Sequence, residues 1–248
     1  MHGLLNLYKP AGPTSYDMIR RIKKIINQGK SIKIGHSGTL DPFAEGVLLV
    51  LFGKATKLAE RLMACPKVYA GSIRLGRSTD TDDRTGRFIG SAPAEALAAL
   101  DPQAVRAAAG RLTGELDQAP PVFSALHLNG RRLYDLARSG QAVSLPPRRV
   151  KIHEFTVTQV DLSDRSSPIA AFRACVGRGA YIRSLARDLG TALGVGGYLE
   201  SLERSAVGPF LSSRSLRLAD DANAGLIAGQ MLNYEQTLTC LDQAESAS

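Results

Sequence analysis

A cluster of turn-forming residues leads directly into a short apolar run. Residues 33–46 read KIGHSGTLDPFAEG, and residues 47–52 read VLLVLF. Glycine, serine, aspartate and proline favour turns, whereas an apolar run of this length with β-branched residues is typical of a strand. The chain must therefore form a sheet with an irregular loop at its edge. Asp41 lies in that loop, and a carboxylate at the edge of a buried strand needs a nearby cation to offset its desolvation.

The remaining pattern mixes helices and strands without a strict alternation of the two. Strands are expected at residues 67–75, 150–162 and 169–176, and helices at residues 14–29, 54–64, 92–116, 180–193 and 225–240. Thr14 or Ser15 can cap the helix at residues 14–29. Asp101-Pro102 interrupts the helix expected at residues 92–116 and caps a new helix that follows. Because strict βαβ repeats are absent, the sequence predicts an α+β fold rather than a doubly wound α/β fold.

Two proline pairs, at residues 120–121 and 146–147, enclose one segment of the chain. Paired prolines at both ends indicate an excursion from the core, and a short helix is expected within it around residues 133–138. After residue 210 the apolar pattern weakens. We therefore expect a main domain of residues 1–210 with an insertion at about 120–147, followed by a short extension of residues 211–248.

Basic residues outnumber acidic ones, with 31 Lys and Arg against 23 Asp and Glu and a formal net charge of +8. A charge of this sign favours a polyanionic partner through long-range attraction and counterion release, and nucleic acid is the common one. The alternative is a solvated basic surface without a partner.

The sequence argues against several classes of protein. No run approaches the ~20 apolar residues that a membrane helix needs, and the first residues lack the apolar region of a signal peptide, so we expect a cytoplasmic protein. The three cysteines and four histidines are widely spaced. That spacing argues against a disulfide framework and a structural zinc site, and it predicts catalysis without a metal.

Two further segments carry residues suited to chemistry. Residues 177–190, GRGAYIRSLARDLG, place Arg183 and Arg187 four residues apart on one face of a helix. Tyr69 lies in the strand expected at residues 67–75, where a tyrosine usually belongs to the core or to an interface. Each segment by itself is more often structural than catalytic.

The motifs form a set that is far more specific than any one of them. Its members are NLYKPAGPTS (6–15), GHSGTLDPFAEGVL (35–48), KVYAGSIRLGRSTDTDDRTG (67–86), PPVFSALHLNGRRLYDLAR (120–138), GRGAYIRSLARDLG (177–190) and LERSAVGPF (202–210). In order and spacing they resemble the TruB-type tRNA pseudouridine synthases, and the resemblance covers residues 3–210. It implies a pseudouridine synthase-like catalytic fold, with a mixed, largely antiparallel sheet and flanking helices.

The resemblance implies an enzyme that flips a uridine of the tRNA T loop, at position 55, and isomerises it to pseudouridine. Asp41 matches the family's essential aspartate, Tyr69 the tyrosine that lies against the base and helps to remove a proton, and Arg183 the arginine paired with the aspartate. Detaching uracil develops positive charge on the sugar, which a carboxylate stabilises or traps. Whether Asp41 adds to the sugar, adds to the ring or only steers the removal of a proton from the ribose stays open. Because the uracil never leaves, no cofactor or metal is implied.

The resemblance also implies how the RNA is held. His36 matches a histidine that occupies the space vacated by the flipped base, and Lys9 belongs to a lysine-proline motif that supports the loop. Further substrate contacts are expected at Tyr181, Leu202, Arg131 and Arg132. The expected partner is the T arm of tRNA, and we expect a monomer with no obligatory protein partner and no membrane attachment.

The sequence departs from the family pattern at two points. Phe123 and His127 stand where the family commonly has tyrosine and lysine, which puts one RNA contact in doubt. Residues 211–248 are too few for the small RNA-binding PUA domain with which family members usually continue.

Three alternative functions stay open at this point. They are a guide-RNA-dependent relative, a tRNA-folding chaperone that acts by binding alone, and a basic globular protein without an RNA partner. The presence of Asp41, Tyr69 and Arg183 together favours an enzyme over a protein that only binds.

Overall fold

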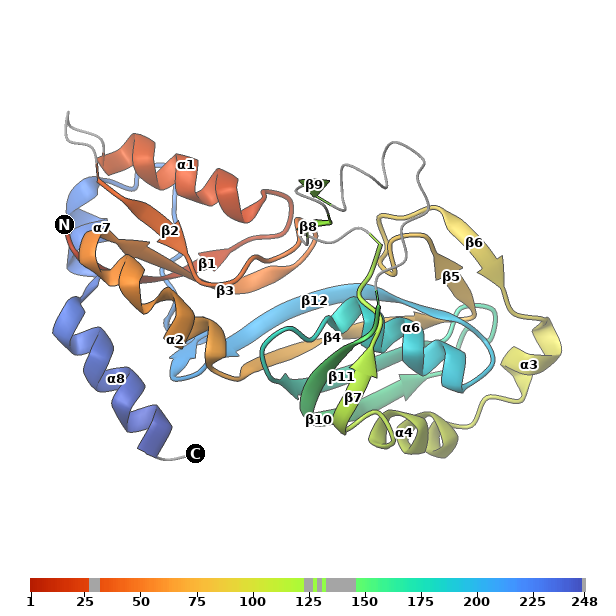
Figure 1. Ribbon diagram of the computed structural model, residues 1–248. Coiled ribbons are helices and arrows are strands. Elements are labelled where there is room, and N and C mark those ends of the chain that lie inside the picture. The colour runs from red at the N-terminus through yellow and green to blue at the C-terminus, as the bar shows by residue number, and fades with distance from the viewer. Residues whose placement is uncertain (27–31, 123–126, 129–130, 133–145, 247–248) are drawn as a thin grey trace. The chain divides into compact units, whose positions relative to one another are not determined.

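Figure 1 shows the computed structural model of the 248-residue protein, which describes residues 1–26, 32–122, 127–128, 131–132 and 146–246. The chain divides into two units, the first made of residues 1–69 and 202–248 and the second of residues 70–201. The boundary falls within two strands, β4 (Lys67–Leu75) and β12 (Gly197–Val207), which neighbour each other in the sheet. Each of these strands therefore contributes residues to both units.

The first unit contains a sheet with the strand order β14-β1-β3-β12. Its other strands and its helical elements are β1 (Gly3–Lys9), α1 (Ser15–Ile26), β2 (Ile34–His36), β3 (Glu45–Phe52), the 3-10 helix η1 (Gly53–Leu58), α2 (Ala59–Ala64), β13 (Phe210–Leu211), the 3-10 helix η2 (Ser212–Arg214), α7 (Ala224–Gly229), β14 (Leu232–Asn233) and α8 (Tyr234–Ser246).

Strand β3 organises this sheet. It pairs with antiparallel β1 along its length, from Lys9 opposite Gly46 to Gly3 opposite Phe52. Its first residues pair in parallel with β12, and its last residues pair with antiparallel β2. The loop at residues 37–44 connects the end of β2 to the start of β3. It is shorter than the turn-rich stretch predicted at residues 33–46, because residues 34–36 form β2 and Glu45 and Gly46 belong to β3.

The sheet of the first unit is covered on both faces, which explains why β3 is apolar throughout rather than alternating. Val47, Leu49 and Leu51 pack in one cluster with residues of η1, α2 and α8. Leu48 and Val50 point the other way and pack with residues of α1 and α7. Figure 1 shows the same arrangement, with α1 on one side of the strands and α2 and α8 on the other.

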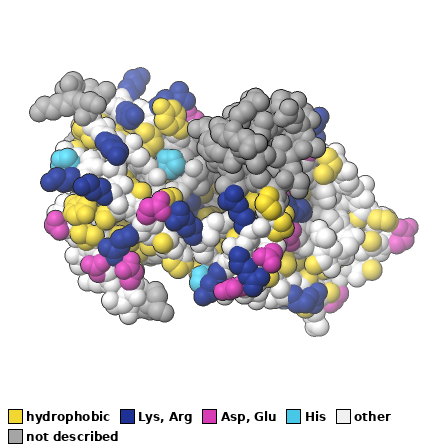
Figure 2. All heavy atoms as spheres, in the orientation of Figure 1, with side chains coloured by type: hydrophobic (Ala, Val, Ile, Leu, Met, Phe, Trp, Pro, Cys, Tyr) yellow, Lys and Arg dark blue, Asp and Glu magenta, His cyan; other side chains and the backbone are white. Residues whose placement is uncertain are grey.

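Helix α1 begins with a capping box. The backbone N–H of Asp17 donates to Oγ1 of Thr14 at 3.0 Å, and the N–H of Thr14 donates to Oδ2 of Asp17 at 2.9 Å. Of the two expected caps, Thr14 is the one used. Arg20, Lys23 and Lys24 are exposed on this helix, and Figure 2 shows Lys and Arg side chains along its outer side.

The second unit is a largely antiparallel sheet with its own helices. Its elements, besides parts of β4 and β12, are β5 (Arg77–Thr79), β6 (Phe88–Ser91), α3 (Ala94–Ala98), α4 (Pro102–Gly110), β7 (Gly114–Gln118), β8 (His127–Leu128), β9 (Arg131–Arg132), β10 (Arg148–Asp161), β11 (Ile169–Val176) and α6 (Ile182–Ala192). Strand β10 pairs with antiparallel β11 on one side and antiparallel β7 on the other. Phe155 and Phe172 meet edge to face between β10 and β11, with ring centroids 5.7 Å apart.

The prediction of one broken helix over residues 92–116 is wrong at its C-terminal end. Asp101 caps α4 as expected, accepting a hydrogen bond from the N–H of Ala104 at 2.9 Å. The helix ends at Gly110, however, and Gly114 has a φ of +93°, a conformation that glycine adopts without strain. The residues after it form β7 because they pair with the first residues of β10.

The residues after position 210 contribute to the first unit. Strand β14 pairs with β1, and Leu241 of α8 is fully buried in the same core cluster as Leu49. The single helix expected at residues 225–240 is two helices, α7 and α8, with β14 between them. Among the described residues, no helix combines the length and apolar character needed to cross a membrane. The short helix expected at residues 133–138 lies outside the described residues.

Candidate active site

The loop that carries Asp41 is tied down along its backbone. Each carbonyl oxygen from residue 38 to residue 42 accepts a hydrogen bond. Arg204 donates from Nη2 to Gly38 at 3.1 Å and from Nη1 to Thr39 at 3.4 Å, and Oγ of Ser15 donates to Leu40 at 3.1 Å. The N–H of Ala44 donates to the carbonyl oxygen of Asp41 at 3.1 Å. The carbonyl oxygen of Pro42 accepts from Nζ of Lys9 at 3.1 Å and from the N–H of Gly12 at 2.8 Å. The backbone around Asp41 is therefore preorganised.

Lys9 supports this loop from β1, as the lysine-proline motif predicts. Its side chain is fully buried, and Nζ also donates to the carbonyl oxygens of Pro10 at 2.8 Å and Pro13 at 2.9 Å. Burial lowers the pKa of Lys9 to about 8, although the charges of Asp41 and Glu45 act to raise it. Lys9 and Asp41 are therefore close enough to interact electrostatically.

His36 ends β2, directly before the loop. Burial, then the charge of Arg204, lower the pKa of His36, so the neutral imidazole is favoured. Nδ1 of His36 and Oγ of Ser37 are buried atoms without a hydrogen-bond partner among the described residues. A neutral ring at this position can stack on a base or fill its place without introducing a charge.

Tyr69 and Leu202 also belong to the first unit, next to its boundary. Tyr69 lies on β4 and is half-buried, and Leu202 lies on β12 and is 7% exposed. A half-buried tyrosine offers one ring face for stacking and a hydroxyl for hydrogen bonding.

Arg183 belongs to the second unit, at the start of α6. It is 5% exposed, Nη1 donates to the carbonyl oxygen of Thr81 at 3.1 Å, and Nε lies 3.7 Å from Oδ2 of Asp83. Asp83 is held in turn by the N–H of Thr85 at 2.9 Å. Asp83 is an acidic partner of Arg183 that the sequence reasoning did not name, although it lies in the quoted stretch at residues 67–86.

Tyr181 precedes α6 in the second unit. Its N–H donates to Oε1 of Gln118 at 2.8 Å, and Nε2 of Gln118 donates back to its carbonyl oxygen at 3.1 Å. Gln118 is 3% exposed and ends β7, directly before the segment at residues 120–147. The start of that segment is therefore attached to the residues that precede Arg183.

Most of the segment at residues 120–147 lies outside the described residues. Arg131 and Arg132 form strand β9, which pairs with β8, and the description covers their backbone only. His127 belongs to β8 in the same way, and Phe123 lies outside the described residues. The roles expected for these side chains stay predictions.

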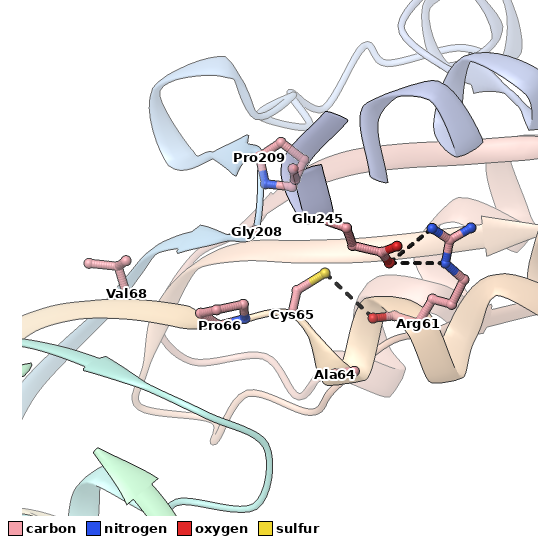
Figure 3. Close-up of a pocket in the computed structure, with 9 residues that line it drawn as sticks. Arg61, Ala64, Cys65, Pro66, Val68, Gly208, Pro209 and Glu245 are labelled. Atoms are coloured by element: carbon pink, nitrogen blue, oxygen red, sulfur yellow. Dashed lines mark hydrogen bonds and ion pairs between the residues drawn. The ribbon is translucent and has the colours of Figure 1, made fainter. Parts of the chain in front are cut away.

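A cavity of about 410 Å³ lies elsewhere in the first unit (Figure 3). It is lined by Arg61, Ala64, Cys65, Pro66, Val68, Gly208, Pro209, Ala244 and Glu245. None of the predicted site residues belongs to this lining. In the described ranges, no group of three or more His, Cys, Asp or Glu side chains is placed to hold a metal ion.

Comparison with known proteins identifies the family of this chain. Residues 23–182 match the model of the N-terminal domain of TruB family pseudouridylate synthases. The chain is 44% identical over 219 residues to tRNA pseudouridine synthase B of Thermobifida fusca, covering 87% of this chain and 73% of that protein. The chain belongs to the TruB family of pseudouridylate synthases. Another TruB relative, tRNA pseudouridine synthase B of Clostridium acetobutylicum, is 38% identical over 243 residues, covering 98% of this chain and 80% of that protein.

Two solved structures share the fold of this chain. The crystal structure of a Cbf5-Nop10-Gar1 complex matches with a TM-score of 0.65 and 28% identity, covering 96% of this chain and 62% of that chain. An archaeal box H/ACA sRNP Nop10-Cbf5 complex matches with a TM-score of 0.64 and 25% identity, covering 96% of this chain and 61% of that chain. The chain thus spans less than two thirds of these structural neighbours. The predicted α+β fold, its largely antiparallel sheet and the enzyme class are confirmed.

Proposed function

We propose that this TruB-family enzyme isomerises uridine to pseudouridine in tRNA, and that its target is position 55 of the T loop. The relatives are named tRNA pseudouridine synthase B, which supports tRNA as the substrate class. The observation that carries the proposal is the loop of Asp41, whose neighbouring carbonyl groups are all held by donors. A carboxylate on such a loop meets the developing charge of a reaction without reorganising.

The isomerisation exchanges one bond to the sugar for another. The bond between N1 and C1′ breaks, a bond between C5 and C1′ forms, C5 loses a proton and N1 gains one. After the base is flipped out of the stack, Asp41 acts by one of three routes. It stabilises or bonds to the positive C1′ of the sugar, it adds to the uracil ring, or it steers removal of a proton from the ribose. Tyr69 stacks on the base and assists removal of the C5 proton. The reaction consumes no external group, so the proposal includes no cofactor.

Arg183 is proposed to pair with Asp41, as the family resemblance implies. Its guanidinium is buried and is already held by Thr81 and Asp83, so little conformational freedom is lost when it acts. His36, Lys9, Tyr181 and Leu202 are proposed to complete the substrate site.

We propose that the enzyme recognises the shape of the T arm. Arg131 and Arg132, in the segment at residues 120–147, are proposed to bind its phosphates. The net charge of +8 supports binding to a polyanion. We propose that the enzyme acts as a monomer in the cytoplasm, without a guide RNA or a protein partner. We propose tRNA-folding chaperone activity as a second activity that follows from RNA binding and accompanies catalysis.

Mapping of pseudouridine tests the proposal. The purified full chain is incubated with T-arm RNA and with unmodified tRNA, and pseudouridine is located by carbodiimide labelling and primer extension. Modification at position 55 of the T loop is expected with no other component present. If pseudouridine forms only when a guide RNA and further proteins are added, the protein is a guide-RNA-dependent synthase. If RNA binds tightly but no pseudouridine forms, the protein is a chaperone that acts by binding alone.

A further inference from the structure

Arg204 places a charged side chain at a core-facing position of β12. It alternates with Leu202 and Ala206, which are also buried, and is itself 2% exposed. It heads the fully buried side chains by size among the described residues. A guanidinium in such a position loses its hydration, so it requires polar partners.

The partners of Arg204 lie on both sides of Asp41 in the chain. Nη2 donates to the carbonyl oxygen of Gly38 at 3.1 Å and Nη1 to that of Thr39 at 3.4 Å. Nε donates to the carbonyl oxygen of Val47 at 2.8 Å. One rigid, planar group therefore joins the start of the loop to the strand that follows it.

The backbone of Arg204 approaches the same loop closely. Arg204 pairs with Gly46 in the parallel register of β12 and β3. Gly46 has a φ of +105°, and a Cβ atom there would lie 2.3 Å from the carbonyl oxygen of Arg204. The main chain and the side chain of Arg204 thus contact the exit of the loop together.

Arg204 also contributes charge to this region. Its described hydrogen-bond partners are carbonyl oxygens, and its charge adds to burial in lowering the pKa of His36 and of Lys9. A buried carbonyl group that loses its donor is destabilised. The carbonyl groups of Gly38, Thr39 and Val47 therefore depend on this one guanidinium for hydrogen bonds.

We propose that Arg204 is a positioning residue for Asp41: it fixes residues 38–47 from both sides and so holds the carboxylate where the reaction needs it. The inference rests on the proposed function, in which Asp41 is the catalytic carboxylate. Arg204 lies in the segment LERSAVGPF, in which the family resemblance implied a role for Leu202 alone.

Substitution of Arg204 tests this role through the rate of the chemical step. Arg204→Met removes the donors and keeps most of the volume. We expect the single-turnover rate of pseudouridine formation to fall about 100-fold, because misplacing a reacting group by about 1 Å has that effect, while the Kd for T-arm RNA stays within about threefold. A folded Arg204→Met protein with a rate within about threefold of wild type would overturn the proposal.

Conservative and matched variants separate positioning from folding. Arg204→Lys keeps the charge and can serve one side of the loop, so it should recover about tenfold of the lost rate. Arg173→Met, which removes an exposed arginine of β11 paired with Glu154, should keep the wild-type rate. If Arg204→Met does not fold, Arg204→Lys decides: a lower rate at unchanged Kd supports the proposal, and a wild-type rate overturns it.

Amide hydrogen exchange gives a readout that does not depend on activity. The N–H of Ser37 donates to the carbonyl oxygen of Leu49 at 3.1 Å, and the N–H of Leu40 donates to Oγ of Ser15 at 2.9 Å. Both amides should exchange at least about tenfold faster in a folded Arg204 variant than in wild type. Unchanged exchange would overturn the positioning role. An inactive wild-type enzyme would instead overturn the proposed function, and the exchange rates would still decide whether Arg204 holds the loop.

Discussion

Nη1 of Arg187 donates a hydrogen bond to Oδ2 of Asp82 at 2.9 Å in the second unit. Asp82 has a φ of +59° and is the only non-glycine residue with a positive φ in the part of the chain that the structure describes. Burial raises the pKa of Asp82 to about 6, even though Arg187 and Arg183 act to lower it. Desolvation therefore outweighs the ion pairs at this carboxyl, and the folded state binds a proton at Asp82 more tightly than the unfolded state does.

This balance predicts how stability depends on pH. The folded pKa of about 6 lies above the unfolded value near 3.8, so the folded state binds more protons between these values and stability falls as the pH rises through them. Asp82→Asn removes this effect and tolerates the same φ. Relative to wild type, its free energy of unfolding should rise by up to about 3 kcal/mol between pH 4 and pH 7. Urea denaturation across that range measures the difference, and a difference that does not change with pH contradicts the prediction.

The loop and the strand behind it could be predicted because their signals are local. Turn formers at residues 33–46 followed by an apolar run predict a loop and then a strand, and the structure has both, although β3 begins at Glu45 and residues 34–36 form β2. The wrong helix end at residues 111–116 has a tertiary cause. Nothing in the local sequence states that Gly114–Gln118 will find the first residues of β10 as a partner.

The buried polar side chains that support the candidate site residues were harder to predict from sequence. Arg204 and Gln118 are buried at 2% and 3% exposure, yet both residue types usually indicate a solvated surface. The signal for Arg204 was its position in an alternating strand, between Leu202 and Ala206 on the core-facing side. The partners of Arg183 could not be inferred either, because Thr81 and Asp83 lie about a hundred residues away in the chain.

Asp41→Asn should abolish isomerisation while the affinity for RNA stays within a few-fold. The substitution removes the charge that stabilises the transition state but leaves the basic surface unchanged. Single-turnover assays and a binding titration on the same RNA measure both quantities. A rate above about one per cent of wild type, which corresponds to a barrier increase of less than about 3 kcal/mol, contradicts the assignment of Asp41 as the essential carboxylate.

Two substitutions of Tyr69 separate its ring from its hydroxyl. Tyr69→Phe keeps the stacking face, so RNA binding should survive while turnover falls. Tyr69→Ala should lower both, since a stacked base contributes about 1 to 3 kcal/mol. Binding and turnover are measured for each variant, and equal turnover of Tyr69→Phe and wild type would show that the hydroxyl takes no part in proton transfer.

The segment at residues 120–147 is expected to clamp the T arm. If recognition depends on the shape of that arm, an isolated T-arm hairpin should react nearly as well as whole tRNA. Affinity should fall steeply with salt, because binding phosphates releases counterions. Turnover and Kd of both RNAs across a salt series measure these effects.

Charge reversal locates the clamp. Arg131→Glu/Arg132→Glu should weaken binding strongly at low salt and reduce the slope of affinity against salt, since two phosphate contacts are lost. Lys23→Glu/Lys24→Glu changes the net charge by the same amount on an exposed part of α1, so it serves as the matched control and should weaken binding much less. If whole tRNA reacts while the isolated T-arm hairpin does not, recognition of the T arm alone is contradicted. If the Arg131 and Arg132 variant binds like wild type while the α1 variant does not, the phosphate contacts lie on α1 instead.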